Sequence, residues 1–358
     1  MIWTVLLFLA LLSILVLAHE WGHYIAAKKA GMTVEEFGLG FPPRLLSWKR
    51  RDGMTVSVNA IPLGGFVKIK GEGGEQADAP DSFARKSIPK RFIVLIAGVL
   101  MNLVAAAIIF TAGFMVGMPT VTEDGIAGGA VSDPAVHVLE VVEGSPAEEA
   151  GIEVGDRLLS IDGTPYDDSD AARAALAPGE GPFALVLARG EEVITVTVDT
   201  AFVDTIGREA VGVGLLETGT VRFPWYLAPL KGIEATVSAT IQIVLALVTL
   251  VVNLVTDAPV DAEIAGPVGI AVVTGEVAKM GFAHLLQFAA MLSINLAVLN
   301  ALPIPALDGG RIAFLFLEAI RRKKASAQFE QTVHTIGFAL LMLLVLVVTF
   351  RDIVGLFN

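Results

Sequence analysis

An apolar run of helix length opens the chain and ends in His19-Glu20-Trp21-Gly22-His23, an H-E-x-x-H motif. On a helix, His19 and His23 lie on one face about one turn apart, so their imidazoles can hold one zinc ion. An ionisable cluster within a membrane span is costly unless it is paired or functional. The motif therefore predicts a Zn²⁺ site in a membrane helix, with Glu20 as the general base on zinc-bound water.

The composition is that of a membrane protein. Of 358 residues, 54% are hydrophobic, which is more than a soluble domain usually contains. Cysteine is absent, so disulfides and thiolate metal ligands are excluded. We expect a lipid bilayer as surroundings, no nucleic-acid partner and a monomer. The N-terminus lacks the basic residues of a signal peptide, so we interpret the first apolar run as a retained span.

Charge is distributed unevenly along the chain and predicts its orientation. Residues 118–235 carry 21 acidic and 6 basic side chains, whereas 28–91 hold 12 of the 25 basic residues and 311–324 hold five more. Because cytoplasmic loops are enriched in Lys and Arg, 28–91 and 311–332 are expected in the cytoplasm and 118–220 outside. We expect four transmembrane helices at 1–27, 92–117, 281–310 and 333–355.

One further apolar run, 237–256, is long enough to span but conflicts with this orientation. If it crossed, Asp308 and the basic cluster that follows would lie outside, opposite the histidines. We therefore expect the whole segment 221–280 to be an interfacial amphipathic or re-entrant segment.

Two segments read as β-structure. The string from Gly144 to Gly163 resembles the core signature of a PDZ domain, and 118–220 has room for one such α+β domain. Residues 55–60 and 66–70 alternate in polarity around Pro62-Leu63-Gly64-Gly65, which predicts a β-hairpin at the cytoplasmic membrane surface. The fold class is thus an α-helical polytopic membrane protein with a membrane-associated hairpin and an inserted extracytoplasmic domain.

A catalytic zinc ion needs a third protein ligand, and Asp308 is the strongest candidate. It follows two helix-breaking prolines in Asn300-Ala301-Leu302-Pro303-Ile304-Pro305-Ala306-Leu307-Asp308, and the predicted orientation puts it on the same side as the histidines. His137 is predicted outside, while His284 and His334 are interpreted as lying near the wrong ends of their spans. The alternative for Asp308 is a residue that merely caps the next helix.

Together, the H-E-x-x-H in the first span, the N-x-x-P-x-P-x-L-D-G-G in the third and the inserted PDZ segment resemble the site-2 protease family of intramembrane zinc metalloproteases. The bacterial RseP/RasP-like branch, here with one PDZ domain, is the most similar. Other matching stretches are Phe37–Phe41, Gly64–Lys68, Ala97–Asn102 and Gly266–Ile270. The resemblance implies that His19, His23 and Asp308 bind Zn²⁺ and that Glu20 is the catalytic base.

The resemblance also implies an activity and its partners. The chain would be a zinc metalloendopeptidase that cleaves transmembrane segments in regulated intramembrane proteolysis, with pre-cleaved anti-sigma factors or signal-peptide remnants as substrates. An unwound substrate would add as a strand to the hairpin at Gly64, Gly65, Phe66 and Val67. Asn300 either donates a hydrogen bond to the substrate backbone or is a polar helix end.

The expected location is the bacterial inner membrane, with the active site near the cytoplasmic face. The PDZ domain would either receive a ligand or exclude bulky substrates by size. Two other readings of the chain are a catalytically inactive membrane PDZ scaffold and an ion- or proton-coupled transporter, in which intramembrane His, Glu and Asp would relay protons.

Overall fold

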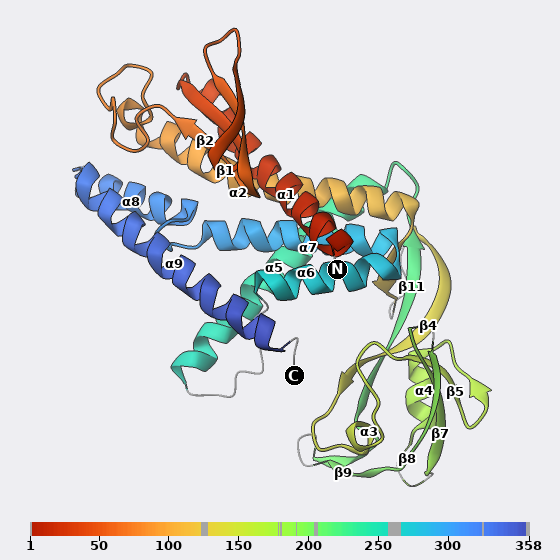
Figure 1. Ribbon diagram of the computed structural model, residues 1–358. Helices are drawn as coiled ribbons and strands as arrows, with labels where there is room; N and C mark the ends of the chain where they lie inside the picture. The colour runs from red at the N-terminus through yellow and green to blue at the C-terminus, as the bar shows by residue number, and fades with distance from the viewer. Residues whose placement is uncertain are drawn as a thin grey trace. The chain divides into compact units, whose positions relative to one another are not determined.

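The computed structural model describes residues 2–122, 128–177, 179, 181–190, 192–203, 207–256, 266–323 and 326–355. The chain divides into two compact units. One unit comprises residues 1–112 and 229–358, and the other comprises 113–228. They are described separately below, and the elements of both are labelled in Figure 1.

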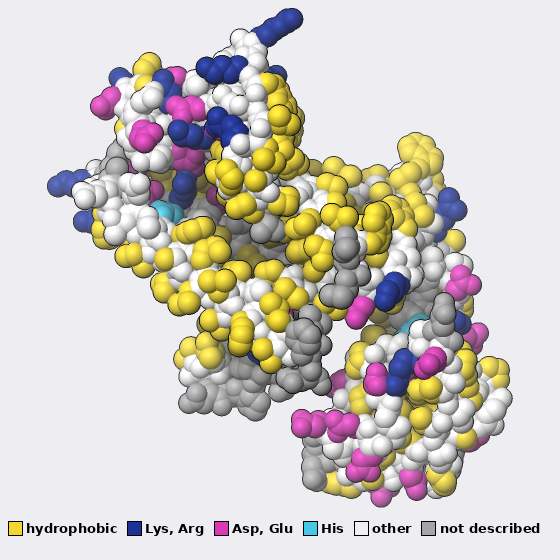
Figure 2. Space-filling model, in the orientation of Figure 1, with side chains coloured by type: hydrophobic (Ala, Val, Ile, Leu, Met, Phe, Trp, Pro, Cys, Tyr) yellow, Lys and Arg dark blue, Asp and Glu magenta, His cyan; other side chains and the backbone are white. Residues whose placement is uncertain are grey.

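Five helices in the described part of the chain are long and apolar enough to cross a membrane. They are α1 (Ile2–Lys29), α2 (Ile88–Val116), α5 (Ala228–Val255), α7 (Phe282–Ala301) and α9 (Ala327–Gly355). Many of their large apolar side chains are exposed, as expected of helices whose solvent is lipid. Figure 2 shows this apolar surface over the helical part of the molecule.

Four of these helices overlap the predicted spans, and α5 is the additional one. The predicted span 281–310 extends beyond α7, which ends at Ala301, and takes in the first residues of α8. Residues 237–256, expected as an interfacial or re-entrant segment, belong to a continuous helix of 28 residues. The length and composition of α5 are sufficient for a transmembrane helix, but they do not show that it crosses the membrane. The count of four transmembrane helices therefore stays a prediction. Part of the predicted segment 221–280, residues 257–265, lies outside the described residues.

Two shorter helices complete the first unit. Helix α6 (Pro267–Met280) packs against α1, α7 and α9. Helix α8 (Asp308–Arg321) corrects the prediction that 311–332 is a cytoplasmic loop. The basic cluster that suggested a loop begins only at the end of α8, while Ile312 and Leu315 pack with Leu95 in a small apolar cluster. Ile312 and Leu315 are three apart and therefore share a helix face. The prediction of a loop rested on the number of basic residues and did not consider this apolar spacing.

The pairing predicted for the hairpin at 55–70 was wrong. Strand β2 (Thr55–Ile69) is continuous, and both of its halves pair with β1 (Val34–Lys49) rather than with each other. Gly38, for example, lies opposite Phe66 on one side and Ser57 on the other. The segment that includes Gly65 to Ile69 therefore forms one outer edge of a small antiparallel sheet that packs against α1.

The second unit is built around a seven-stranded sheet, in which β6 (Thr164–Pro165) pairs with β5 off the main path of six strands. The path runs through β3 (Met118–Val121), β11 (Val213–Arg222), β4 (Ala130–Val141), β5 (Arg157–Ile161), β7 (Phe183–Arg189) and β8 (Glu192–Val198). Helices α3 (Pro146–Glu149) and α4 (Ser169–Ala175), with the small pair β9 (Ala201–Val203) and β10 (Arg208–Ala210), complete the unit. A single apolar core that includes Val136, Leu158 and Leu187 agrees with one domain in this region.

Candidate metal centre

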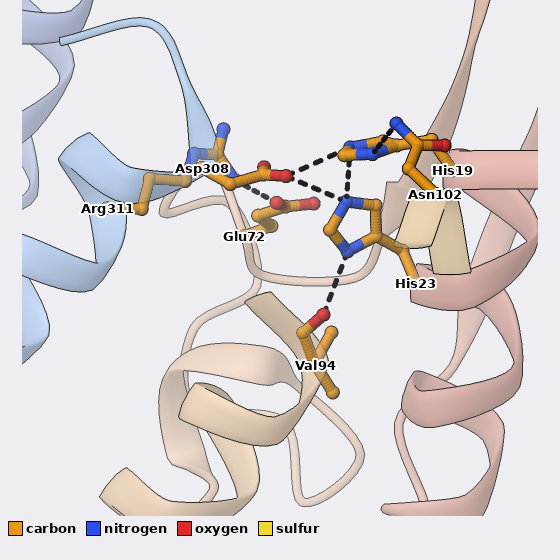
Figure 3. Close-up of polar contacts among 7 residues, drawn as sticks. All are labelled: His19, His23, Glu72, Val94, Asn102, Asp308 and Arg311. Atoms are coloured by element: carbon orange, nitrogen blue, oxygen red, sulfur yellow. Dashed lines mark hydrogen bonds and ion pairs between the residues drawn. The ribbon is translucent and has the colours of Figure 1, made fainter. Parts of the chain in front are cut away.

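Three side chains from distant parts of the sequence converge within the first unit. His19 Nε2 lies 3.1 Å from His23 Nε2, and Asp308 Oδ2 lies 3.0 Å from the former and 3.1 Å from the latter (Figure 3). Both imidazoles are buried, whereas the Asp308 side chain keeps 20% of its surface exposed. The cluster is thus closed on the helix side and open on the Asp308 side.

The atoms of this cluster suit a zinc ion. In a tetrahedral site with bonds of about 2.0–2.1 Å, neighbouring ligand atoms are about 3.3–3.4 Å apart, so these three need to separate by only a few tenths of an ångström. Two imidazole nitrogens and one carboxylate oxygen are also a ligand set used by catalytic zinc, which keeps a fourth position open. Among the described residues, these three are the group of such side chains that could hold a metal.

Contacts behind the imidazoles orient them for this purpose. His23 Nδ1 lies 2.8 Å from the backbone carbonyl of Val94, so Nδ1 carries the proton and Nε2 is free to bind a metal. His19 Nδ1 lies 3.4 Å from the Asn102 side-chain amide, whose oxygen is buried and has no partner. Rotation of that amide would present its oxygen to Nδ1–H. In that orientation Asn102 would support His19 as Val94 supports His23.

Helix α2 can approach the histidines because it carries glycine at the contact. A Cβ at Gly98 would lie 2.4 Å from His23 Nε2 and 2.7 Å from His19 Nε2. On the facing helix, a Cβ at Gly22 would lie 2.3 Å from the carbonyl oxygen of Ala97. The two glycines let α1 and α2 meet backbone to backbone at the level of the cluster.

Replacing Gly98 by Ala should therefore weaken zinc binding while leaving the helix intact. The new methyl group would push both imidazoles away from the position where their Nε2 atoms meet Asp308. We expect a loss of zinc affinity of about 10–100-fold, the size typical of changes behind metal ligands. Chelator competition on the purified protein measures it. Gly355→Ala, at an open helical position, is the matched control. Equal zinc affinity of both variants would contradict this packing role.

Asp308 reaches the histidines because the chain turns sharply between α7 and α8. Pro303 and Pro305 end α7, and Asp308 is the first residue of α8. At Gly309, a Cβ would lie 2.1 Å from the Leu302 carbonyl oxygen, and at Gly310 it would lie 2.4 Å from that of Ile304. The two glycines thus allow the tight turn that aims the Asp308 carboxylate at α1.

Glu20 lies between the histidines and the β-sheet. Its carboxylate interacts with His19, His23 and Asp308, and it accepts a hydrogen bond from the backbone amide of Val67 in β2. A Cβ at Gly65 would lie 3.7 Å from Glu20 Cγ, so β2 packs closely on this part of α1. The arrangement places a carboxylate beside the metal cluster and at the edge of a strand.

The other predicted residues form the surroundings of this cluster. Gly64 and Gly65 are buried against α1, and the Phe66 ring covers Gly38 and stacks on Phe41. Asn300 lies in the last turn of α7, half-buried, with no hydrogen-bond partner among the described residues.

Sequence reasoning missed several residues near the cluster. Asn102 and Gly98 are four apart on α2, and that spacing on one helix face was a usable signal. The expectation that His334 lies at the wrong end of its span was wrong, because His334 Nδ1 accepts a hydrogen bond from the backbone amide of Ala306, two residues before Asp308. An ion pair between Glu72 and Arg311, one turn after Asp308, had no local signal at all (Figure 3).

Comparison with known proteins agrees with this geometry. The family model described as Peptidase family M50 matches residues 7–344. The chain belongs to peptidase family M50. A protein of Clostridium perfringens is 38% identical over 96% of each chain, and one of Rhizobium meliloti is 33% identical over 99% of this chain and 98% of its own. Both carry the name "Putative zinc metalloprotease".

Membership of family M50 makes this chain a zinc metalloprotease of the site-2 type, as the sequence motifs predicted. The five apolar helices agree with a multi-pass membrane protein. Among solved structures, a PDZ domain of an SdrC-like protein from Listeria monocytogenes matches 24% of this chain and 92% of its own, at 19% identity and a TM-score of 0.21. The likeness is too low to carry an argument, so the PDZ assignment continues to rest on the Gly144–Gly163 signature.

Proposed function

We propose that this M50 protease hydrolyses peptide bonds within membrane-spanning segments, with His19, His23 and Asp308 as zinc ligands and Glu20 as the general base. The observation that supports the proposal most strongly is the meeting of three ligand atoms at 3.0–3.1 Å from α1 and α8, with Glu20 beside them. The chemistry of the donor set, two imidazoles and one carboxylate, supports it further.

The metal ligands and Glu20 would have different roles in peptide hydrolysis. A zinc ion held by the three ligands would supply a Lewis acid that polarises the scissile carbonyl and lowers the pKa of water. Glu20 takes a proton from the attacking water and delivers it to the leaving amine. The hydrogen bonds behind His19 and His23 keep their Nε2 atoms aimed at one point, so the site does not have to rearrange during the reaction.

A cavity of about 770 Å³ lies next to the turn that carries Asp308 and would bring water close to the site. Ala306 and Arg311, which bracket Asp308 in the sequence, both line it, and charged side chains such as Glu72 and Glu330 make its wall polar. A polar cavity beside an apolar helix bundle supplies the reactant that a hydrolase within a membrane otherwise lacks.

The substrate has to be an unwound strand rather than a helix. In an intact helix the peptide groups are hydrogen-bonded internally and shielded, so none is available for attack. The outer edge of β2 can pair with an extended segment, because main-chain groups on a free edge bind a strand in any sequence context. Gly64, Gly65, Phe66 and Val67 lie on this part of β2, and Gly65 and Val67 are next to Glu20. Asn300, half-buried and with no hydrogen-bond partner among the described residues, would donate to the same backbone.

Val67→Pro tests the contact between this part of β2 and Glu20. Proline removes the Val67 amide that faces Glu20, whereas an edge strand tolerates proline better than a central one. Loss of one hydrogen bond, worth about 1 kcal/mol, predicts a fall of roughly fivefold or more in kcat/KM. Zinc content should not change. Val67→Thr keeps both the amide and the side-chain shape and should cleave like the wild type. Unchanged kcat/KM in Val67→Pro would show that the Val67 amide has no role in the reaction.

The same cluster constrains how many times the chain crosses the membrane between α1 and α8. Because Asp308 contacts His19 and His23, the membrane must be crossed an even number of times between them. Helices α2 and α7 account for two crossings. If α5 also crossed, α6 would have to return, but its 14 residues extend only about 21 Å, less than the ~30 Å hydrocarbon core. This supports an α5 that lies along or dips into the membrane, and four transmembrane helices.

We assign the cytoplasmic side to the cluster because the basic segments 28–91 and 311–324 flank it in sequence. The acidic PDZ unit then lies outside a bacterial inner membrane. Its position in the sequence, between two spans of a protease, favours a filter that admits pre-cleaved substrates such as anti-sigma factors or signal-peptide remnants. A peptide-receiving PDZ groove is the alternative.

A reconstitution experiment tests the proposed function. The full chain, purified with zinc, is incorporated in liposomes together with a single transmembrane segment carrying tags on both sides, and the products are identified by mass spectrometry. Cleavage at a bond within the apolar segment supports the proposal. Cleavage confined to soluble loops, or zinc-loaded protein that cuts nothing, would contradict it.

A further inference from the structure

The turn that carries Asp308 contains a backbone conformation that needs support. Ala306 has φ of +81°, in the left-handed region that residues with a Cβ adopt only at a cost. Such conformations persist where the surrounding structure holds them in place, and they concentrate at functional sites. Ala306 is two residues before Asp308, so its conformation decides where the Asp308 carboxylate points.

His334 on α9 supplies that support. Its Nδ1 accepts a hydrogen bond of 2.9 Å from the backbone amide of Ala306. The imidazole is itself fixed by the Phe314 ring of α8, with ring centroids 5.7 Å apart. One turn further along α9, a Cβ at Gly337 would lie 2.3 Å from Pro305 Cβ, so α9 packs tightly against this turn. Since Nδ1 accepts, the proton of the neutral ring is on Nε2.

The other side of Asp308 is held by an ion pair. Arg311, one turn after Asp308 on α8, contacts the Glu72 carboxylate in the segment that follows β2 (Figure 3). The turn is therefore anchored on one side to α9 and on the other to the segment that follows β2. His334 is the anchor that acts on the strained residue directly.

We infer that His334 is a positioning residue for Asp308: it holds Ala306 in the left-handed conformation that aims the carboxylate at His19 and His23. The inference rests on the proposed role of Asp308 as a zinc ligand. His334 hydrogen-bonds the Ala306 amide and neither that ligand nor the two histidines, so it acts through the backbone of the turn.

Three variants of one side chain test this role. His334→Asn keeps an acceptor oxygen near the place of Nδ1, whereas His334→Gln moves it towards the place of Nε2 and His334→Ala removes it. Zinc affinity of the purified full chain is measured by chelator competition, beside cleavage of the reporter segment. We expect losses of about 10–100-fold in zinc affinity for Ala and Gln, as for other groups behind metal ligands, and near wild-type affinity for Asn. Thr335→Val, a neighbour on α9, is the control and should bind zinc normally.

A second variant addresses the turn itself. Glycine adopts positive φ without the Cβ penalty, so Ala306→Gly should restore part of the zinc affinity lost in His334→Ala. Circular dichroism and thermal unfolding confirm that each variant is folded. Equal zinc affinity of Ala, Gln and wild type would overturn the inference, as would equal losses in Asn and Gln. A wild-type protein that binds no zinc would instead refute the proposed function, so the two failures are distinguishable.

Discussion

Glu20→Gln is expected to abolish cleavage of a transmembrane reporter while leaving zinc bound. Glutamine has the size of glutamate but cannot accept the proton of the attacking water, so proton transfer to the leaving amine is lost as well. A positioned general base contributes about 10²–10⁴-fold to rate, and we expect a loss at the upper end because Glu20 serves both proton transfers. Single-turnover cleavage in liposomes, with zinc quantified in the same sample, measures the effect.

The matched control is Glu276→Gln on α6, an exposed carboxylate with no described contact to the cluster. It should cleave at the wild-type rate. If Glu20→Gln retained both its zinc and its full rate, Glu20 would not be the base. If it lost its zinc, the observed loss of cleavage would have to be attributed to the metal site instead.

Asp308→Ala is expected to remove zinc and, with it, activity. Two imidazoles from one helix would remain, and an incomplete ligand set holds the ion far less well. We expect the affinity to fall by more than the 10–100-fold that is typical of changes behind the ligands, that is, by more than about 100-fold. Chelator competition at fixed pH measures it, and added zinc should restore little cleavage.

Asp78→Asn is the control for Asp308→Ala, because Asp78 is an exposed carboxylate that lines the cavity next to the turn carrying Asp308. Wild-type zinc affinity is expected for it. An Asp308→Ala protein that bound zinc as tightly as the wild type would show that the third ligand lies elsewhere. His137 of the PDZ unit would not replace it, since its side chain hydrogen-bonds Thr218.

The sequence predicted the helices and motifs whose signals lie within a few neighbouring residues. His19 and His23 are i and i+4, a spacing that fixes their shared helix face without reference to the rest of the fold. The apolar runs and the Gly144–Gly163 signature are local in the same sense. The third ligand, Asp308, could also be predicted, because the distribution of Lys and Arg indicates on which side of the membrane each segment lies.

Features that arise only from packing were not predictable in this way. Strand β1 carries Pro42, Pro43 and two glycines, which usually argue against a strand, and it forms because both halves of β2 pair with it. The contact of His334 with Ala306 spans 28 residues, and the ion pair of Glu72 with Arg311 spans 239. Neither has a periodicity or motif, since each depends on where two elements meet.

The most direct test of the zinc assignment is an anomalous-scattering measurement on crystals of the purified protein, on either side of the zinc absorption edge. The account predicts one zinc peak about 2.0–2.2 Å from His19 Nε2, His23 Nε2 and an Asp308 carboxylate oxygen, with Glu20 beside the ion rather than bound to it. A zinc peak at any other group of residues, or one that persists at full occupancy in a His19, His23 and Asp308 triple alanine variant, would contradict it.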